Sequence, residues 1–421
     1  MIKTSHDVPP GKLSHCQITG SNNLFEVIDL GHQAPCDALL TTETINQPEP
    51  TYPLRMLICP ESGSAQLDYV VDGSVIYYPE YPYRSGISKP LQVYQEAFAD
   101  DIVNDFSIPV GSLCVDIGSN DGTLLTGFRR NGMTTLGIEP TNMAKLAREQ
   151  NKIDTIQAFF TEAVARDIVS DRGFAKIITM TNVFAHMAPL GEVMRGLTRL
   201  LDPKGIFISE SQYLLDVLEG NQFEGIYHEH IRTYSLKALV TLMPFYGLEV
   251  FDVGRASRYG GNIRIYVARK NVHPISSRVF ELLAKEESSG LFSPNAWAKW
   301  RQRVSDNRVQ FMELAYEAKR RGQQFVGDSC PGRGAVLVQY YGLDKTLIPY
   351  IAQLPGSEKI GKYLPGTHIP VVDNQIILEE HPEYIVILAW HYSEYIIQQW
   401  RAKGVTSRFV LPLPTFTVVE Q

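Results

Sequence analysis

Apolar runs of strand length alternate with helical stretches through the middle of the chain. Residues 112–115 form a short, mainly apolar run that predicts a buried strand, residues 116–122 form a glycine-containing turn, and residues 123–128 predict the start of a helix. Further strands are predicted at residues 134–138, 175–180 and 205–210. A strand, a glycine-rich turn and a helix in succession are typical of the opening unit of a nucleotide-binding α/β domain.

The pattern differs on either side of this region. Residues 1–90 are rich in Pro, Tyr and turn residues, with short alternating strands such as the one predicted at 54–59, whereas residues 91–270 carry the βαβ alternation. In residues 271–421, a polar helical stretch at 277–320 precedes a second α/β series. Its strands are predicted at 324–327, 384–389 and 408–411. We therefore predict a small β-rich N-terminal domain, a central Rossmann-like domain and a C-terminal Rossmann-like α/β domain with these bounds.

Composition narrows the functional classes. The 421 residues are 44% hydrophobic and 20% charged, as expected for a globular protein of two or three domains. The net charge of -7 and the lack of a basic patch argue against a nucleic-acid partner. No apolar stretch has the length of a membrane span, the first residues show no signal-peptide pattern, and five scattered cysteines do not suggest disulfides. We expect a cytoplasmic protein, either a monomer or a homodimer.

The turn at residues 116–122 indicates which nucleotide is bound. Gly118 and Gly122 allow a tight turn, but Asn120 replaces the middle glycine of a dinucleotide motif, and no lysine follows to make a P-loop. Glu139 ends the second strand about 20 residues later, where a carboxylate can hold ribose hydroxyls. The turn resembles motif I of class I methyltransferases, which bind S-adenosyl-L-methionine; an ordinary glycine turn is the alternative. The predicted cofactor-binding residues are Asp116, Gly118, Asn120, Gly122, Glu139, Pro140, Phe159 and Asn182.

Several other segments indicate a family. In chain order they are residues 81–85 (YPYRS), 182–186 (NVFAH), 226–230 (IYHEH), 259–264 (YGGNIR), 362–368 (KYLPGTH) and 388–390 (LAW). Together they resemble the sugar C-methyltransferases that act on nucleotide-linked 4-keto-deoxyhexoses. The resemblance covers nearly the whole chain. It implies a zinc-binding N-terminal domain, a central methyltransferase domain, and a C-terminal Rossmann-like domain that helps to hold the sugar nucleotide.

Methyl transfer from a sulfonium to carbon needs a carbanion equivalent, which a ketone supplies when a base removes its α-proton. His230 is the natural base because histidine titrates near neutral pH, and Glu229 could orient it. Tyr227 and Tyr81 could donate hydrogen bonds to the carbonyl oxygen as charge develops there. His186 is expected just after the fourth strand of the central domain. The resemblance implies that these five residues match the active-site set of the family, with His230 as the base.

Two pairs of metal ligands in the family are incomplete in this chain. The family holds zinc with two Cys-x-x-Cys pairs, but here Thr19 stands where the partner of Cys16 would be, and Ser62 stands where the partner of Cys59 would be. Two thiolates and two hydroxyls make a poor tetrahedral zinc site. We therefore predict no bound metal, with substitute ligands such as His15, His32 or Cys36 as the alternative. His228 is expected to support its turn rather than to bind a metal.

Two further departures concern the substrate. The family usually has His-Gly-Gly-Ser where this chain has residues 259–262 (YGGN), and the turn at 328–335 also differs from the family pattern. In that turn Arg333 could pair with a diphosphate, whereas Trp390 and His391 are expected to pack within the C-terminal domain. The expected substrate is a small molecule, a nucleotide-linked keto-sugar. C-, O- or N-methylation of another metabolite, or a non-catalytic binding role, remain as alternatives.

Overall fold

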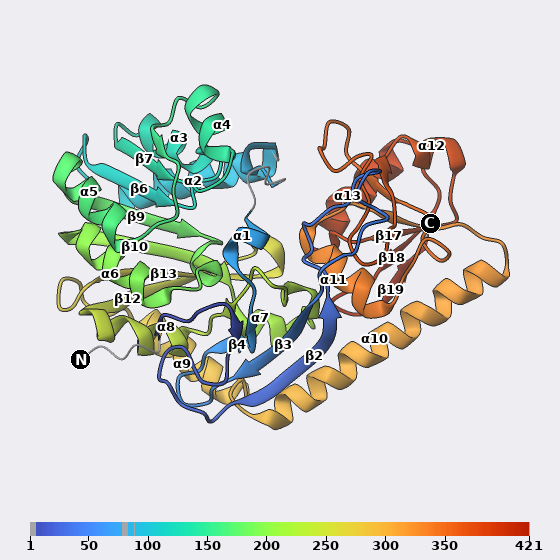
Figure 1. The fold of residues 1–421 in the computed structure, drawn as a ribbon, viewed down its shortest axis with the longest axis horizontal. Helices are drawn as coiled ribbons and strands as arrows, with labels where there is room; N and C mark the ends of the chain where they lie inside the picture. Colours follow the sequence, from blue (N-terminus) through green and yellow to red (C-terminus); the bar gives the residue numbers. More distant parts are fainter. Residues whose placement is uncertain (1–5, 78–82, 88, 421) are drawn as a thin grey trace.

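The computed structural model describes residues 6–77, 83–87 and 89–420. Figure 1 shows a large sheet at one end of the molecule, a second α/β unit at the other, and a small antiparallel sheet beneath and between them. The predicted class, an α/β protein with a Rossmann-like central sheet and a second α/β sheet domain, is confirmed. Within the described residues, no helix combines the length and apolar character needed to cross a bilayer.

The large sheet has seven strands in the order β12-β13-β10-β9-β6-β7-β8. They are β6 (Leu113–Ile117), β7 (Thr134–Ile138), β8 (Thr155–Ile156), β9 (Ala175–Thr181), β10 (Leu201–Gln212), β12 (Leu248–Ala256) and β13 (Asn262–Arg269). Strands β6 to β10 are parallel, and β13 pairs antiparallel with both β10 and β12. The chain leaves β6 toward β7 on one side and later returns to β9 on the other. Ligands bind at such a switch point, beyond the carboxyl ends of the strands.

Helices cover both faces of this sheet, because alternate strand residues point to opposite sides. Val115 belongs to the apolar cluster that includes Leu197 of α6, whereas Cys114 belongs to the cluster formed with Phe98 of α2 and Phe128 of α3. The helices of this part of the chain are α2 (Lys89–Asp105), α3 (Thr123–Arg130), α4 (Met143–Glu149), α5 (Glu162–Arg172), α6 (Leu190–Leu200), α7 (Leu214–Glu219), α8 (Leu236–Leu242) and α9 (Ser277–Ser288).

The N-terminal residues form a four-stranded sheet in the order β11-β4-β3-β2. Three strands are local in sequence: β2 (Phe25–Gln33), β3 (Tyr52–Ile58) and β4 (Ala65–Leu67). The fourth, β11 (Arg232–Thr233), lies far along the chain and directly follows the predicted catalytic segment. It pairs antiparallel with β4, and the Leu67 amide also donates to the Ile231 carbonyl at 2.9 Å. The N-terminal sheet therefore holds the chain immediately after His230.

The C-terminal unit is a six-stranded sheet in the order β16-β15-β14-β17-β18-β19. Its strands are β14 (Phe325–Asp328), β15 (Ile351–Gln353), β16 (Val371–Asp373), β17 (Tyr384–Ile387), β18 (Arg408–Leu411) and β19 (Thr417–Val419). All pair in parallel except β19, which is antiparallel to β18. Its helices are α11 (Gly332–Tyr341), α12 (Ile376–Glu380) and α13 (Ser393–Ala402). The three strands predicted from the sequence are confirmed as β14, β17 and β18.

One helical stretch was predicted at residues 277–320, but the structure has two helices there. Helix α9 ends at Ser288, and α10 (Pro294–Arg320) begins after a turn in which Gly290 has a positive φ and Pro294 starts the new helix. Figure 1 shows α10 running beneath the molecule from the central domain to the C-terminal sheet. The Trp300 indole donates to the Val217 carbonyl at 2.9 Å, and Phe311 packs edge-on against Phe325 of β14. Helix α10 thus joins the domains through a buried face that is apolar except for Asn307.

Glu286 of α9 is fully buried and holds both ends of the segment that carries the predicted catalytic residues. Its carboxylate accepts hydrogen bonds from the backbone amides of Leu236 (2.5 Å) and Lys237 (3.0 Å), at the start of α8. It also accepts from the Tyr213 hydroxyl (2.9 Å), just after β10. A carboxylate at a helix N-terminus satisfies amides that have no partner within the helix. Burial raises the pKa of Glu286.

Glu286→Ala should lower the free energy of unfolding by about 3 kcal/mol, because it leaves two buried amides and a phenol without their acceptor. Chemical denaturation measures this change. Lys285→Ala is the matched control, since the exposed Lys285 side chain forms an ion pair with Glu219, whose loss should cost less than about 1 kcal/mol. Equal effects of the two substitutions would contradict the role assigned to Glu286.

Candidate active site

The glycine turn lies at the carboxyl end of β6, at the switch point of the sheet. Gly118, Asn120 and Gly122 all have positive φ angles, of 72°, 50° and 78°. A Cβ on Gly118 would lie 2.5 Å from the Val183 side chain, and Gly122 precedes the first residue of α3. Both glycines are therefore required by the backbone, one for its close approach to the segment after β9 and the other for a left-handed helix start.

Glu139 follows β7 and faces this turn. One carboxylate oxygen accepts from the Asn120 amide at 3.0 Å, and the other accepts from the amide (3.0 Å) and hydroxyl (2.7 Å) of Thr141. A carboxylate offers about four acceptor positions, so three bonds leave capacity for a ribose hydroxyl. Glu139 thus shapes the turn with which it was predicted to bind the cofactor. Pro140 follows it directly in the chain.

Asn120 has a second role that the sequence did not reveal. Its side-chain oxygen accepts from the Ser85 amide at 2.9 Å, and its side-chain nitrogen donates to the Tyr83 carbonyl at 3.1 Å. Next to it, Asp121 accepts from the Arg84 guanidinium and the Gly86 amide, both at 3.0 Å. Residues 83–86 are therefore hydrogen-bonded to the glycine turn at residues 116–122, the cofactor turn. A glycine at position 120 could not make these side-chain bonds, which explains the departure from the dinucleotide motif.

The remaining predicted cofactor-binding residues lie at different positions along the carboxyl edge of the large sheet. Asp116 lies within β6, almost fully buried, and accepts from the Thr179 hydroxyl of β9 at 2.6 Å. Burial, with the Glu139 charge, raises the pKa of Asp116 to about 7. Asn182 follows β9 in a left-handed conformation, and its side-chain oxygen accepts from Asn262 at 3.2 Å. Phe159 lies beyond β8 with half of its side chain exposed, which suits a ring that stacks on a base.

Three of the predicted catalytic side chains come together close to this turn. His186 belongs to a 3-10 turn, η3 (Phe184–His186), which follows β9, the fourth strand of the central domain, as expected. The His230 ring centroid lies 4.9 Å from that of His186 and 4.1 Å from that of Tyr227. The cofactor turn contacts Val183, three residues before His186. The cofactor turn and the histidine cluster therefore share the segment after β9. Tyr81 lies outside the described residues.

The hydrogen bonds of His230 fix its tautomer. Its Nδ1 lies 2.8 Å from the Gly225 carbonyl oxygen and 3.1 Å from the Gln212 side-chain oxygen. A carbonyl oxygen only accepts, so Nδ1 carries the hydrogen and Nε2 carries the lone pair. Burial lowers the pKa of His230 to about 3, and the ring is neutral at neutral pH. Neither Gln212 nor Gly225 was singled out from the sequence, because the turn that brings them to His230 is set by tertiary structure.

His228 contacts the N-terminal domain, whereas Glu229 borders both that domain and Tyr227, whose pKa its negative charge raises. Glu229 is buried and its carboxylate lies within 4.8 Å of the Cys36 sulfur and an Asp37 carboxylate oxygen. His228 contacts the Tyr52 carbonyl of β3 at 3.3 Å, and burial lowers its pKa to about 4. These contacts support the expectation that His228 stabilises the turn. They place Glu229 against the N-terminal residues that precede β3.

A positive charge is buried beside the cluster. Arg232 of β11 is 1% exposed and donates to three uncharged acceptors: the Tyr234 hydroxyl (3.0 Å), the Gln17 side chain (2.6 Å) and the Met187 carbonyl. Burial, with the nearby His230 and Arg232, holds the pKa of His186 well below its usual value. Arg232 therefore adds to the effect of burial on the neighbouring imidazole while it joins the N-terminal and central domains.

The C-terminal domain contacts the segment that carries Tyr227 and His230 through Glu224. Arg333 of α11 forms an ion pair with Glu224, and its guanidinium also donates to the Tyr259 carbonyl at 2.7 Å. Trp390 donates to the same Glu224 carboxylate at 2.8 Å, so it bridges two domains rather than packing only within its own. Tyr259 has a positive φ of 51°, and its hydroxyl bonds to that of Tyr83 at 2.9 Å. Arg333 therefore pairs with the Glu224 carboxylate of the protein itself.

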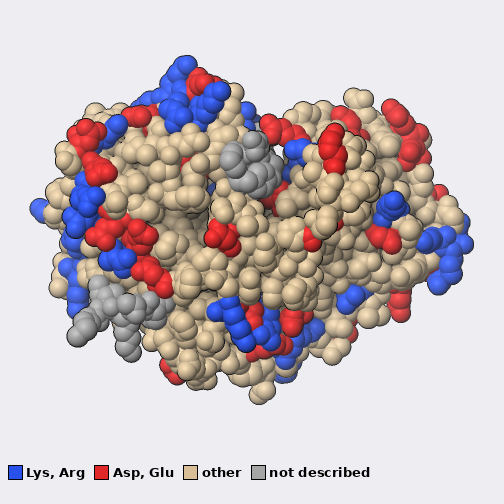
Figure 2. All heavy atoms as spheres, viewed as in Figure 1, with Lys and Arg blue, Asp and Glu red and all other residues tan. Residues whose placement is uncertain are grey.

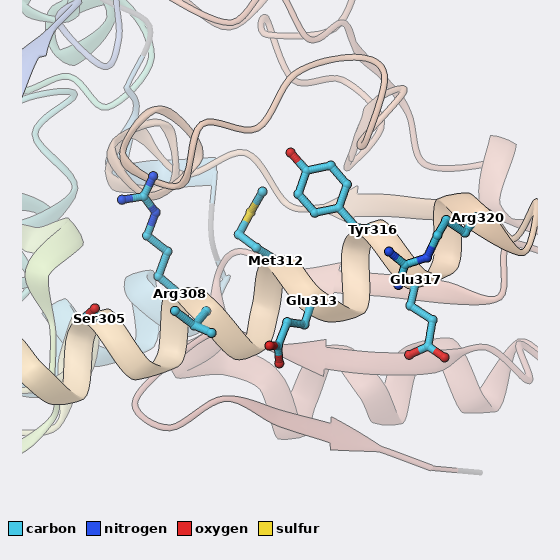
Figure 3. Close-up of a pocket in the computed structure, with 8 residues that line it drawn as sticks. Ser305, Arg308, Met312, Glu313, Tyr316, Glu317 and Arg320 are labelled. Atoms are coloured by element: carbon cyan, nitrogen blue, oxygen red, sulfur yellow. The ribbon is translucent and has the colours of Figure 1, made fainter.

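One hollow outside this cluster, among the described residues, is of a different kind. It has a volume of about 690 Å³ and lies along α10, where Figure 3 shows Arg308, Met312 and Tyr316 projecting from the same side of the helix. All of its lining residues come from one helix, so it lacks polar groups converging from separate elements. On the face in Figure 2, basic and acidic side chains are interspersed. The candidate active site is therefore the cluster around His230.

Three known domain families match successive parts of the chain. Residues 16–77 match a family described as a putative zinc binding domain, and residues 91–253 match a methyltransferase domain. Residues 257–414 match the C-methyltransferase C-terminal domain. The chain is also 30% identical over 412 residues to C-methyltransferase NovU of Streptomyces niveus, a match that covers 97% of both proteins.

Two solved structures resemble a part of the chain. A methyltransferase from Anabaena variabilis is 14% identical and covers 42% of this chain and 86% of its own, with a TM-score of 0.34. Magnesium protoporphyrin IX methyltransferase from Synechocystis, solved with bound S-adenosylmethionine, is also 14% identical. It covers 42% of this chain and 79% of its own, with a TM-score of 0.32. The full-length relative and the matched domains show that the chain belongs to the S-adenosylmethionine-dependent C-methyltransferases.

Proposed function

We propose that this enzyme methylates the carbon next to the ketone of a nucleotide-linked keto-deoxysugar, with His230 as the base that forms the enolate. The observation that carries the proposal is the fixed tautomer of His230, whose Nδ1 faces the Gly225 carbonyl so that Nε2 carries the lone pair. The resemblance of the motifs at residues 226–230 and 362–368 to sugar C-methyltransferases supports the choice of substrate.

The residues at the sheet edge fit the cofactor, which supplies an electrophilic methyl group on a sulfonium. Gly118 and Gly122 let the backbone approach it, and Glu139 would hold the ribose while it orders the Asn120 amide. Phe159 would cover the adenine. Residues 83–86, fastened to Asn120 and Asp121, would restrict access of water to the bound cofactor. Asp116 of β6 accepts a hydrogen bond from Thr179 of β9 and so links the two strands next to the cofactor turn.

Removal of the α-proton leaves negative charge on the carbonyl oxygen of the substrate, and Tyr227 is suited to stabilise it. Burial and the Glu229 charge raise the pKa of Tyr227 well above its usual value, so its hydroxyl stays protonated and donates. His186 remains neutral for the reasons given above. The developing enolate would itself favour a positive charge on His230, which offsets the burial that makes the free imidazole a weak base.

His230→Ala should lose most proton exchange and most methylation, by about 10²–10⁴-fold, because both need the base. The measurement is deuterium uptake at the α-carbon of a nucleotide-linked 4-keto-deoxyhexose in deuterated water, with S-adenosylhomocysteine in place of the methyl donor. His228→Gln is the matched control, since His228 contacts a backbone carbonyl away from the cluster, and exchange should survive. Exchange at the wild-type rate in the alanine variant would refute His230 as base. A methyl found on oxygen or nitrogen would refute the enolate route.

The pH dependence of kcat/KM should lack an acid limb near pH 6.5. The free-enzyme profile reports the pKa of the essential base, and burial lowers the pKa of His230 to about 3. The ring is the neutral form above that value, so lowering the pH from 8 to 5 leaves it competent. A limb centred between pH 6 and 7 in the wild-type enzyme would contradict this account, provided that circular dichroism shows the fold to be intact.

Glu139→Ala should weaken S-adenosylmethionine binding by about 1.5–3 kcal/mol, the range for a hydrogen bond to a charged group. Calorimetry with the cofactor and with S-adenosylhomocysteine measures the loss. Thr141→Ala removes one loop bond to the same carboxylate without removing the ribose ligand, so its effect should be several-fold smaller. Unchanged affinity in Glu139→Ala would rule out this carboxylate as the ribose ligand.

A further inference from the structure

The N-terminal domain keeps two matching turns at the positions where its family would hold zinc. In the first turn the Cys16 amide donates to the Ser21 carbonyl (2.8 Å), and the Gly20 amide donates back to the Cys16 carbonyl (2.8 Å). In the second, the Cys59 amide donates to the Ser64 carbonyl (3.0 Å), and the Gly63 amide donates to the Cys59 carbonyl (2.8 Å). The two loops repeat one hydrogen-bond pattern with the same spacing from each cysteine.

The four side chains at the ligand positions face one another. The Cys16 sulfur lies 3.2 Å from the Ser62 hydroxyl, and the Cys59 sulfur lies 3.9 Å from the Thr19 hydroxyl. Each contact therefore crosses from one turn to the other. Cys16, Cys59 and Ser62 are fully buried, and the Ile18 amide donates to the Cys16 sulfur at 3.4 Å. The cluster thus has the crossed arrangement of a four-ligand centre, with hydrogen bonds in place of metal bonds.

This set of donors does not fit zinc. Structural zinc takes four ligands from thiolates, imidazoles and carboxylates, whereas a neutral hydroxyl is a poor ligand. Among the described residues, no third His, Cys, Asp or Glu offers a ligand atom within 4.8 Å of both sulfurs. Cys36 lies instead with Asp37 and Glu229, and the Lys359 ammonium pairs with Asp37 at 2.9 Å. The group of Cys36, Asp37 and Glu229 therefore already contains a cation, the Lys359 ammonium.

We propose that the N-terminal domain works without zinc, and that cross-turn thiol–hydroxyl hydrogen bonds among Cys16, Thr19, Cys59 and Ser62 hold its two turns in the geometry of a tetrahedral metal site. The match to a family described as zinc-binding therefore reflects the fold of this segment and not a bound metal. Two substitutions, Thr19→Cys and Ser62→Cys, complete a set of four cysteine ligands and restore zinc binding.

The cluster matters for the active site because the second turn leads directly into β4, the strand that pairs with β11 after His230. The Gly63 carbonyl of that turn accepts from the Ser235 hydroxyl at 2.8 Å, and the Pro60 carbonyl accepts from the Lys237 ammonium at 2.9 Å. The turn therefore contacts the chain just beyond β11 as well. Its hydrogen-bonded side chains supply locally the rigidity that a zinc ion would give.

The test begins with the wild-type chain, purified without chelator from cells grown with added zinc. Elemental analysis should find far less than one zinc per chain, and chelator should not change the melting temperature, since a structural zinc stabilises the fold directly. One zinc per chain that disappears in Cys16→Ser or Cys59→Ser would overturn the proposal. Cys36→Ser is the control for the second cysteine group and should not change the zinc content.

The double variant T19C/S62C tests the geometry. It should bind one zinc per chain, and chelator should lower its melting temperature, while T19V/S62A should bind none and melt below the wild type. A folded T19C/S62C chain that binds no zinc would overturn the tetrahedral arrangement. If the double variant does not fold, T19C and S62C separately supply three thiolates. Absence of the visible absorption of tetrahedral cobalt thiolates in both would then overturn it.

Discussion

The antiparallel pairing of β11 with β4 is the constraint on which the active site depends. This two-residue strand places Arg232 beside Gln66 and fixes the chain two residues after His230. On the other side, the Gly225 carbonyl holds His230 through Nδ1. Farther out, Glu286 binds both Tyr213 and the start of α8. The proposed base therefore lies on a short segment that contacts the N-terminal sheet through β11 and the C-terminal domain through Glu224, which limits its movement without placing it in a regular element.

Burial determines the charge state of this segment. Imidazoles taken out of water lose their preference for the charged form, and the buried Arg232 acts on His186 in the same direction. The same burial favours the protonated form of Tyr227. A neutral base beside a protonated phenol is the starting state that enolisation needs. The N-terminal domain contributes directly to this electrostatic arrangement through Gln17, which accepts one of the Arg232 hydrogen bonds.

Local pattern was enough for four strands of the central sheet and for the cofactor turn, but it did not predict β8, β12 and β13. The strand at 112–115, the glycines and Glu139 follow from short-range periodicity and spacing, and the cysteine losses at residues 19 and 62 are visible directly. Contacts between distant segments were not predictable in this way. Strand β11 is too short to show a period, the bonds of Asn120 to residues 83–85 depend on tertiary structure, and Trp390 reaches a carboxylate in another domain. The break between α9 and α10 does carry a local signal in Gly290 and Pro294, which the prediction of a single helix did not use.

The central claim is that His230 is a neutral imidazole with its hydrogen on Nδ1 at neutral pH. Nitrogen-15 NMR of histidine-labelled enzyme tests it directly, because the protonated and lone-pair nitrogens of a neutral ring have well-separated shifts, and His230→Gln identifies the signal. The account predicts one protonated nitrogen, Nδ1, and a lone-pair Nε2 at pH 7, unchanged down to pH 5. An imidazolium at pH 7, or a ring protonated on Nε2, would contradict it.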